Sequence, residues 1–390
     1  MYTGLVTEKS FKVKVLHLVK TSEGAPFAVR QMRELVNLGV EVHVALPAGG
    51  RFIALYEAAG VHIHPAQLDF PVRKPWYLPD RFRTLRRLVK EVQPDIIHSH
   101  FVGTTLTMRL ALGPKHPTPR FFQVAGPLHL ENPLVRRVEM ASASTPDRWI
   151  GSCQRTCDYY RAAGFQENRI FLSYYGTDIE KFSSTRTGKF RQALNLDMDT
   201  TLVGMVAYIY APKRFIGQKR GLKGHEDLID ALKLCLAKGV RLKGVFVGGP
   251  WDGSERYEAQ VRAYAQAQCS DDAVFLGHRN DVGELYPDLD IAVHPSLSES
   301  VGGAVESLLA RVPTIATNVG GFPDLVVDGQ TGWLVPPRCP EQIAAAILRY
   351  IDDPDTAKAL AANGQRRAEY LFDVRRTAKE ILEIYKTVKI

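Results

Sequence analysis

Long apolar runs are missing from this 390-residue chain. No stretch approaches the roughly 20 apolar residues that a helix needs to cross a bilayer. Residues 1–14 are too polar and too charged for a signal peptide, so we expect a cytoplasmic protein. Disorder is also excluded, because 45% hydrophobic and 24% charged residues are typical of a globular chain, here long enough for two domains.

Cysteine is scarce and shows no metal-binding pattern. The five cysteines are odd in number and lack zinc-ribbon spacing, so we expect reduced, buried thiols rather than disulfides or a structural metal. The acidic triplet Asp288-Leu289-Asp290 superficially resembles a metal-binding pair, but Asp290 begins an apolar strand. Clustered cations elsewhere can neutralise a phosphate in place of a divalent ion. The sequence therefore predicts no metal and no cofactor.

The excess of positive charge lies entirely in the first half of the chain. The net charge of +8 divides into 24 basic and 16 acidic residues up to position 183, and 26 of each after it. The densest patch places Arg81, Arg83, Arg86, Arg87 and Lys90 at helical spacing among apolar side chains. Such a helix either lies against an anionic membrane, here the inner face, or is an ordinary surface helix with a solvated basic face. A nucleic-acid partner is not expected, because no recognised binding module or aromatic platform accompanies the charge.

Short apolar runs alternate with amphipathic helical segments along both halves of the chain. The first half has expected strands at 13–19, 40–46, 61–64, 96–98, 121–124, 149–152 and 170–174, and the second begins with strands at 202–207, 242–247, 273–276 and 291–294. This alternation predicts an α/β fold with two Rossmann-like, doubly wound domains facing a central cleft. Residues 182–201 are polar and poorly periodic, so we expect them to link a domain at 1–183 to one at 184–373.

Residues 290–337 point most directly to function. A short apolar strand is followed by Gly302 and Gly303 and then by a helix expected over 304–310. Glycines before a helix N-terminus let the backbone approach a phosphate, and Glu299 and Glu306 on either side suit sugar hydroxyls rather than phosphate. The alternative is structural: a chain turn with a carboxylate that complements the helix dipole. Phosphate and hydroxyls together suggest a nucleotide sugar.

The same segment resembles the donor-binding signature of the retaining glycosyltransferases of family 4, which have the GT-B fold. The matching positions are Pro295-Ser296, Glu299, Gly302, Glu306, Val312-Pro313 and Gly320-Gly321. In the family seven residues separate the two glutamates, whereas six separate them here, so Ser298 occupies the position of a strictly spaced first glutamate.

The resemblance implies a GT-B enzyme that transfers a sugar from a nucleoside diphosphate sugar, such as a UDP- or GDP-sugar, to an acceptor hydroxyl. It implies retention of anomeric configuration, no metal, and a final helix at 374–390 that crosses back to the first domain. The backbone of Gly302, Gly303 and Ala304 would hold the diphosphate, Glu306 the ribose and Glu299 the sugar. The main chain of Gly277, His278 and Arg279 would face the base. The acceptor would be a sugar, a lipid-linked sugar or a small molecule in polysaccharide or glycoconjugate biosynthesis.

A basic stretch at 211–224 supplies the expected phosphate cations. Lys223 before Gly224 matches the family's phosphate lysine. The family's arginine is missing, because Tyr208 stands in its place, so Arg214 and Arg220 are candidates to replace it. The alternative is a solvated basic loop.

Several residues of the first half are weaker candidates. Gly24 follows the first strand, where GT-B proteins have a glycine loop near the transferred sugar. His129 is the histidine nearest to the family's position beside that sugar. His100 at a strand end, together with Arg83 and Arg87, is assigned to the acceptor side.

Two other functional classes stay open from the residues alone. A nucleotide-sugar epimerase of GT-B type would bind the same donor, but it would act without an acceptor. A non-enzymatic nucleic-acid-binding protein would instead show salt-sensitive binding to RNA or DNA.

Overall fold

The first domain is built on a seven-stranded parallel sheet in the order β3-β2-β1-β4-β5-β6-β7. The computed structural model describes residues 12–197, 199–212 and 218–388. The strands are β1 (Lys14–Leu18), β2 (Glu41–Leu46), β3 (His62–Pro65), β4 (Ile96–Ser99), β5 (Arg120–Val124), β6 (Asp147–Gly151) and β7 (Ile170–Leu172). The helices are α1 (Pro26–Asn37), α2 (Ile53–Ala58), α3 (Leu78–Val92), α4 (Val102–Leu112), α5 (Leu128–Glu131), α6 (Pro133–Ala141) and α7 (Gln154–Ala162). β4 and β5 are buried along their whole length, as expected where helices cover both faces of a parallel sheet.

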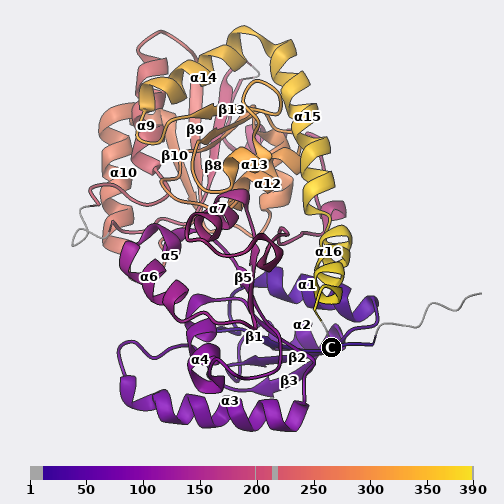
Figure 1. Cartoon of the computed structure of the whole chain (residues 1–390). Helices are drawn as coiled ribbons and strands as arrows, with labels where there is room; N and C mark the ends of the chain where they lie inside the picture. The colour runs from indigo at the N-terminus through magenta and orange to yellow at the C-terminus, as the bar shows by residue number, and fades with distance from the viewer. Residues whose placement is uncertain (1–11, 198, 213–217, 389–390) are drawn as a thin grey trace, which may run out of the picture.

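The second domain has a six-stranded parallel sheet in the order β10-β9-β8-β11-β12-β13. Its strands are β8 (Thr201–Val206), β9 (Leu242–Val247), β10 (Ala273–Gly277), β11 (Ile291–His294), β12 (Thr314–Thr317) and β13 (Trp333–Val335). Its helices are α9 (His225–Leu236), α10 (Glu255–Cys269), α11 (Val282–Leu285), α12 (Gly302–Leu309), α13 (Phe322–Leu325), α14 (Pro340–Asp352) and α15 (Pro354–Phe372). The two domains lie one above the other in Figure 1. The predicted α/β architecture of two doubly wound domains is confirmed.

The chain passes between the domains twice, and the two passages pair with each other. The Thr177 N–H donates to the Phe372 carbonyl at 2.7 Å, and the Val374 N–H donates to the Thr177 carbonyl at 3.1 Å. After this point α16 (Val374–Lys386) lies beside α1 of the first domain (Figure 1). Ile381 and Tyr385 of α16 are fully buried in the hydrophobic core of the first domain. The last helix therefore completes the core of the first domain.

The segment expected to be a polar link is instead fastened to the second domain. It contains a short helix, α8 (Lys189–Ala193). The Asp288 carboxylate accepts hydrogen bonds from the backbone N–H groups of Thr187, Gly188 and Phe190 at 2.7–3.0 Å. The first carboxylate of the acidic triplet thus anchors the chain just before α8.

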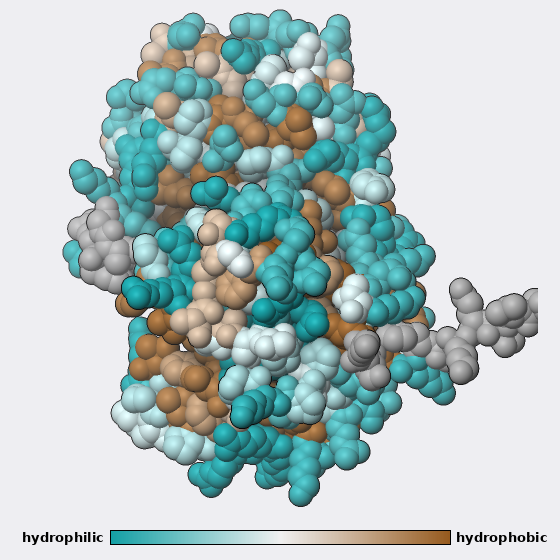
Figure 2. All heavy atoms as spheres, in the orientation of Figure 1, coloured by the Kyte–Doolittle hydropathy of each residue, from teal (hydrophilic) through white to brown (hydrophobic). Residues whose placement is uncertain are grey.

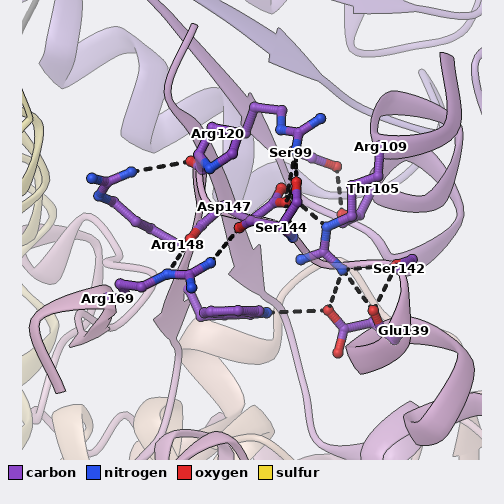
Figure 3. Close-up of polar contacts among 12 residues, drawn as sticks. Ser99, Thr105, Arg109, Arg120, Glu139, Ser142, Ser144, Asp147, Arg148 and Arg169 are labelled. Carbon is purple, nitrogen blue, oxygen red and sulfur yellow. Dashed lines mark hydrogen bonds and ion pairs between the residues drawn. The ribbon is translucent and has the colours of Figure 1, made fainter. Parts of the chain in front are cut away.

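A network of buried charges joins α4, α6, β5 and β6 of the first domain (Figure 3). The Arg109 guanidinium contacts the carboxylates of Glu139 at 2.8 Å and Asp147 at 3.1 Å. Arg120 contacts the other Asp147 oxygen at 2.8 Å. All four side chains are at most 1% exposed, and their two positive and two negative charges cancel. Pairing of this kind is what makes buried ions tolerable.

The basic helix α3 forms the outer edge of the first domain. Its apolar stripe, Leu85, Leu88 and Val92, is buried, and hydrophilic side chains dominate the lower end of the molecule in Figure 2, where α3 lies in Figure 1. Within the described part of the chain, no helix combines the length and hydropathy required to cross a membrane.

Candidate active site

A pocket of about 340 Å³ opens at the carboxyl ends of the strands of the second domain. We call it the central pocket. It is formed by the ends of β8, β9, β10 and β11 and by the first turns of α12. Seven of the predicted donor residues line it, namely Lys223, His278, Arg279, Glu299, Gly302, Gly303 and Glu306. Ligands of open α/β sheets bind at this position.

Two glycine pairs allow the loop before α12 to pack closely. Gly302 has φ +34°, and a Cβ there would lie 2.9 Å from the Glu299 carboxyl carbon. Gly320 has φ +55°, and its Cβ would lie 1.6 Å from the Glu299 carbonyl oxygen. A side chain at Gly321 would meet the Ser300 carbonyl at 2.3 Å. Backbone atoms leave no room for a Cβ at Gly320 and Gly321, and the positive φ of Gly302 favours glycine, so these residues fix where Glu299 stands.

Lys223 and Glu299 form an ion pair inside the central pocket, and both side chains are largely buried. Lys223 is brought there by Gly224, which has φ +74° and whose Cβ would lie 2.1 Å from the Pro295 carbonyl oxygen. The other Glu299 oxygen accepts the Ser300 N–H at 3.1 Å. Glu299 faces the pocket despite the shortened spacing, whereas Ser298 is buried and does not line it.

Glu306 projects into the central pocket from the second turn of α12, because this helix begins at Gly302 rather than at Ala304. Its side chain makes no hydrogen bond to any described residue. Burial raises the pKa of the Glu306 carboxyl, and the positive charge of Arg30 on α1 of the first domain opposes that rise. A carboxylate with free acceptor positions suits ligand hydroxyls.

His294 forms part of the pocket wall as a neutral imidazole. Burial and the nearby Lys223 charge lower its pKa to about 3. Its Nε2 and the Ser307 hydroxyl are joined by a hydrogen bond of 2.9 Å. His294 therefore supplies a fixed polar wall without adding charge.

The structure separates Arg220 from Lys223, which corrects its assignment to the diphosphate. Arg220 contacts Asp227 at 2.5 Å and Asp230 at 2.7 Å, and it borders a different depression beside α9. Two carboxylates that hold one guanidinium keep it away from a phosphate. Arg214 lies outside the described residues. Gly277 and Ala304 adjoin the central pocket without lining it, and Ala304 is fully buried.

His129 and Gly24 do not line the central pocket either. His129 belongs to α5, where its ring lies 5.6 Å from that of Phe122. Burial lowers its pKa to about 4. The first domain approaches the donor loop through Gly126, since a Cβ there would lie 3.7 Å from that of Ser300. The Ser152 hydroxyl also lies 3.1 Å from the Ser300 hydroxyl.

His100 is fully buried in the first domain, which corrects its assignment to the acceptor side. Its Nε2 lies 2.8 Å from Nδ1 of His17, and its Nδ1 lies 2.7 Å from the Tyr175 hydroxyl. His98 stacks on His100, and its Nδ1 lies 2.5 Å from the Tyr385 hydroxyl of α16. Ring nitrogens of the three imidazoles, one from each, lie within 4.8 Å of one another, and Nε2 of His17 and of His98 is buried without a hydrogen-bond partner. The three neutral, stacked rings form a histidine chain in which His98 bonds Tyr385 and ties α16 to the sheet, while His17 and His100 bond each other.

Arg83 and Arg87 are exposed on α3, which lies at the end of the first domain farther from the second domain (Figure 1). Neither side chain lines the central pocket, and their assignment to the acceptor side stays a prediction. Arg87 instead lies 3.8 Å from Glu91 one turn along the same helix.

Sequence reasoning missed two charged or polar residues near the central pocket. Arg30 reaches Glu306 only because α1 of the first domain packs beside the second domain, and no local pattern marks it. His294 stands directly before Pro295 at the end of β11, which is a signal that could have placed it on the pocket wall.

Both halves of the chain match known glycosyltransferase families. Residues 214–367 match the family described as glycosyl transferases group 1, and residues 25–181 match glycosyltransferase family 4. Two domains that match these families, with a pocket at the strand ends of the second, define a GT-B glycosyltransferase. The chain belongs to family 4 of these enzymes.

Individual relatives agree with this assignment. A capsular polysaccharide biosynthesis glycosyltransferase, CapM of Staphylococcus aureus, is 25% identical and covers 96% of this chain and 97% of its own length. A D-inositol 3-phosphate glycosyltransferase of Rhodococcus opacus is 29% identical over 66% of this chain and 57% of its own length. Among solved structures, Anabaena HepE in complex with UDP superposes with a TM-score of 0.80 at 21% identity, covering 96% of this chain and all of HepE.

Proposed function

We propose that this glycosyltransferase takes its sugar from a nucleoside diphosphate sugar, transfers it to an acceptor hydroxyl with retention of configuration, and needs no metal. The observation that carries the proposal is the convergence of Lys223, Glu299 and Glu306 with the glycine start of α12 in one pocket. The cation and the helix N-terminus suit a diphosphate, and the two carboxylates suit sugar hydroxyls. The relative HepE has been solved with UDP and with UDP-glucose, which supports a donor of this class.

The proposed mechanism is electrostatic. When the bond from the sugar carbon to the diphosphate oxygen breaks, negative charge grows on the leaving diphosphate. Lys223 and the backbone amides of Gly302 and Gly303 stabilise that charge in a site shielded from water. In a front-face reaction the acceptor oxygen enters on the side of the leaving group and its proton passes to a leaving phosphate oxygen, so no enzyme nucleophile is required. The first domain covers the pocket near Ser300 and limits hydrolysis.

Glu306 provides the direct test of donor binding. We expect Glu306→Ala to weaken binding of UDP or GDP about ten-fold or more, because hydrogen bonds to a charged group are worth about 1.5–3 kcal/mol. Isothermal titration calorimetry measures the affinity, and Glu57→Ala, an exposed glutamate on α2, is the matched control. Unchanged affinity of the Glu306 variant would remove its role on the ribose.

Transfer is proposed in preference to epimerisation, since both curated relatives described above are glycosyltransferases by name. We propose a sugar, a lipid-linked sugar or a small molecule as the acceptor. Incubation of the protein with a donor sugar alone separates the two reactions, because an epimerase would convert the donor without an acceptor.

A cytoplasmic location with contact to an anionic membrane surface is a further proposal. It is supported by the exposed guanidinium groups of α3 and by Trp76, which is 67% exposed just before this helix. Co-sedimentation with anionic vesicles, but not with neutral ones, is the expected result. Equal binding to both kinds of vesicle would contradict the proposal.

A further inference from the structure

A row of aromatic rings extends from the cation of the central pocket. The Lys223 ammonium lies 5.8 Å from the centre of the Tyr210 ring. Tyr210 stacks on Trp251 at 5.5 Å, and Trp251 meets Tyr208 edge-on at 5.1 Å. Tyr208 then stacks on His278 at 5.9 Å, with an angle of 17° between the ring planes. Tyr208, Tyr210 and His278 line the central pocket.

Backbone pairing beyond the ends of β8, β9 and β10 holds these rings in place. The Ile209 N–H donates to the Gly249 carbonyl, and the Trp251 N–H donates to the Ile209 carbonyl, both at 2.9 Å. The Gly248 N–H donates to the Gly277 carbonyl at 2.8 Å. Gly248 has φ +125°, and a Cβ there would lie 2.1 Å from the Ala207 carbonyl oxygen. The close approach of these segments therefore depends on glycine.

The rings of this row are more exposed than a core requires. Tyr208 is 37% exposed and Trp251 47% exposed. Aromatic side chains gain stability from burial and from stacked partners, so a preformed and partly open row is suited to a flat ligand ring. Because the row begins at Lys223, the ligand that fits carries an anionic group next to an aromatic ring.

We propose that Tyr208, braced by Trp251, stacks against the base of the nucleoside diphosphate donor. This inference rests on the proposed function. It gives Tyr208 a role that differs from phosphate binding: the ring face, and not the hydroxyl, makes the contact. Tyr208 and Trp251 then determine how tightly a base is held, while Lys223 holds the diphosphate.

The test compares nucleoside diphosphates with inorganic pyrophosphate by isothermal titration calorimetry. Tyr208→Leu should weaken binding of the best of UDP, GDP and ADP about ten-fold, since stacking of a base on an aromatic side chain is worth about 1–3 kcal/mol. Trp251→Leu should weaken it in the same direction, because Tyr208 loses the ring that braces it. Pyrophosphate binding should stay within about two-fold of wild type, because it has no ring. Tyr208→Phe keeps the ring and should bind the nucleotide within about two-fold of wild type.

The controls separate the possible failures. Tyr370→Leu removes an aromatic ring that is 67% exposed on α15 and should leave the nucleotide and pyrophosphate affinities unchanged. Thermal unfolding of each variant reports intact folding. Equal losses for Tyr208→Phe and Tyr208→Leu would show a hydroxyl contact and overturn the inference. Wild-type nucleotide affinity in Tyr208→Leu and Trp251→Leu would overturn it while leaving the proposed function intact. A wild-type protein that binds no nucleoside diphosphate would overturn both.

Discussion

At the scale of single residues, Lys223 and Glu299 form an ion pair that neutralises both charges inside the central pocket. The lysine proposed to hold the diphosphate already has a carboxylate partner, and so does a second cation that lines the pocket, Arg279, which pairs with Asp281. An arriving diphosphate must therefore compete with a carboxylate for each cation. Such competition lowers affinity but leaves Lys223 accurately positioned.

Removing the Glu299 charge should strengthen nucleotide binding and weaken catalysis. We expect Glu299→Gln to lower the Kd for UDP or GDP about three- to ten-fold, because Lys223 is released and a repulsive charge is lost. Sugar transfer should fall, since the oriented carboxylate is gone. Calorimetry and a product assay measure the two effects, with Glu57→Gln as the control. Weaker binding in Glu299→Gln would contradict the competition described above.

Residue roles could be predicted from the sequence only where a local pattern carries them. Lys223, Glu299 and Glu306 follow directly from short motifs next to glycines, and the structure brings them together. Arg220 has equally suitable chemistry, but Asp227 and Asp230, seven and ten positions further on, hold it elsewhere. Arg30 was beyond prediction because its proximity to Glu306 depends on the packing of one domain against the other.

At the scale of elements, the loop between β11 and α12 is held by its fit against the turn at Gly320 and Gly321. The Gly321 N–H donates to the Ser300 carbonyl at 2.7 Å. The position of Glu299 in the central pocket therefore depends on a second loop, which follows β12.

Gly320→Ala should displace this loop. Its Cβ would overlap the Glu299 carbonyl oxygen, whereas Gly329, with a similar φ of +67°, has only a Trp333 ring carbon at 3.6 Å. Gly329→Ala should lower the free energy of unfolding by about 1–2 kcal/mol, because alanine is strained in the left-handed backbone conformation. Gly320→Ala should lower the free energy of unfolding by at least about 1 kcal/mol more than Gly329→Ala does, because the added methyl group overpacks the loop. It should also reduce the rate of sugar transfer. Urea unfolding and a product assay measure both, and equal behaviour of the two variants would contradict the packing argument.

Most strands and longer helices could be predicted from apolar periodicity, with ends that differ by one or two residues. α5 and α6 could not, because Pro127 and Pro133 interrupt the periodicity within 14 residues. The structure starts α6 with a cap that the sequence carries: the Asn132 side chain accepts the Leu134 and Val135 N–H groups at 3.1 Å each. α8 escaped prediction because it is short and is held by Asp288 from another part of the chain.

At the scale of the whole molecule, buried neutral histidines make stability depend on pH. Burial lowers the pKa of His100, His225 and His294 to about 3 each, and that of His17 and His98 also falls well below 6.5. The unfolded chain then binds more protons than the folded one at acidic pH. Stability is complete above pH 6.5 and is lost progressively as the pH falls from 6.5 toward 3.

Below pH 6.5 the free energy of unfolding should fall by about 1.4 kcal/mol per pH unit for each such histidine. Urea unfolding at pH 7.5, 6.0 and 5.0 should show the free energy of unfolding falling with pH. His225→Gln should reduce that fall by about 2 kcal/mol between pH 6.5 and 5.0, which isolates one group from the others. An unchanged slope in this variant would show that His225 is not neutral in the folded protein.

The architecture of the whole molecule could be predicted because alternating strands and helices allow few topologies. Its buried polar chemistry could not. The ionic network around Arg109 and Asp147 (Figure 3) and the histidine chain under α16 join residues up to 287 positions apart. Each such contact forms only after the folded sheet has brought its two residues together, so no local sequence pattern marks it.

The position of α16 also has a consequence for biosynthesis. The first domain is synthesised first, yet its core lacks Ile381 and Tyr385 until residues 374–386 have left the ribosome. The main core of the second domain does not need a segment from outside that domain, because its buried members lie between Val203 and Leu360. We therefore expect the main core of the second domain to be complete before the core of the first domain as the chain is translated.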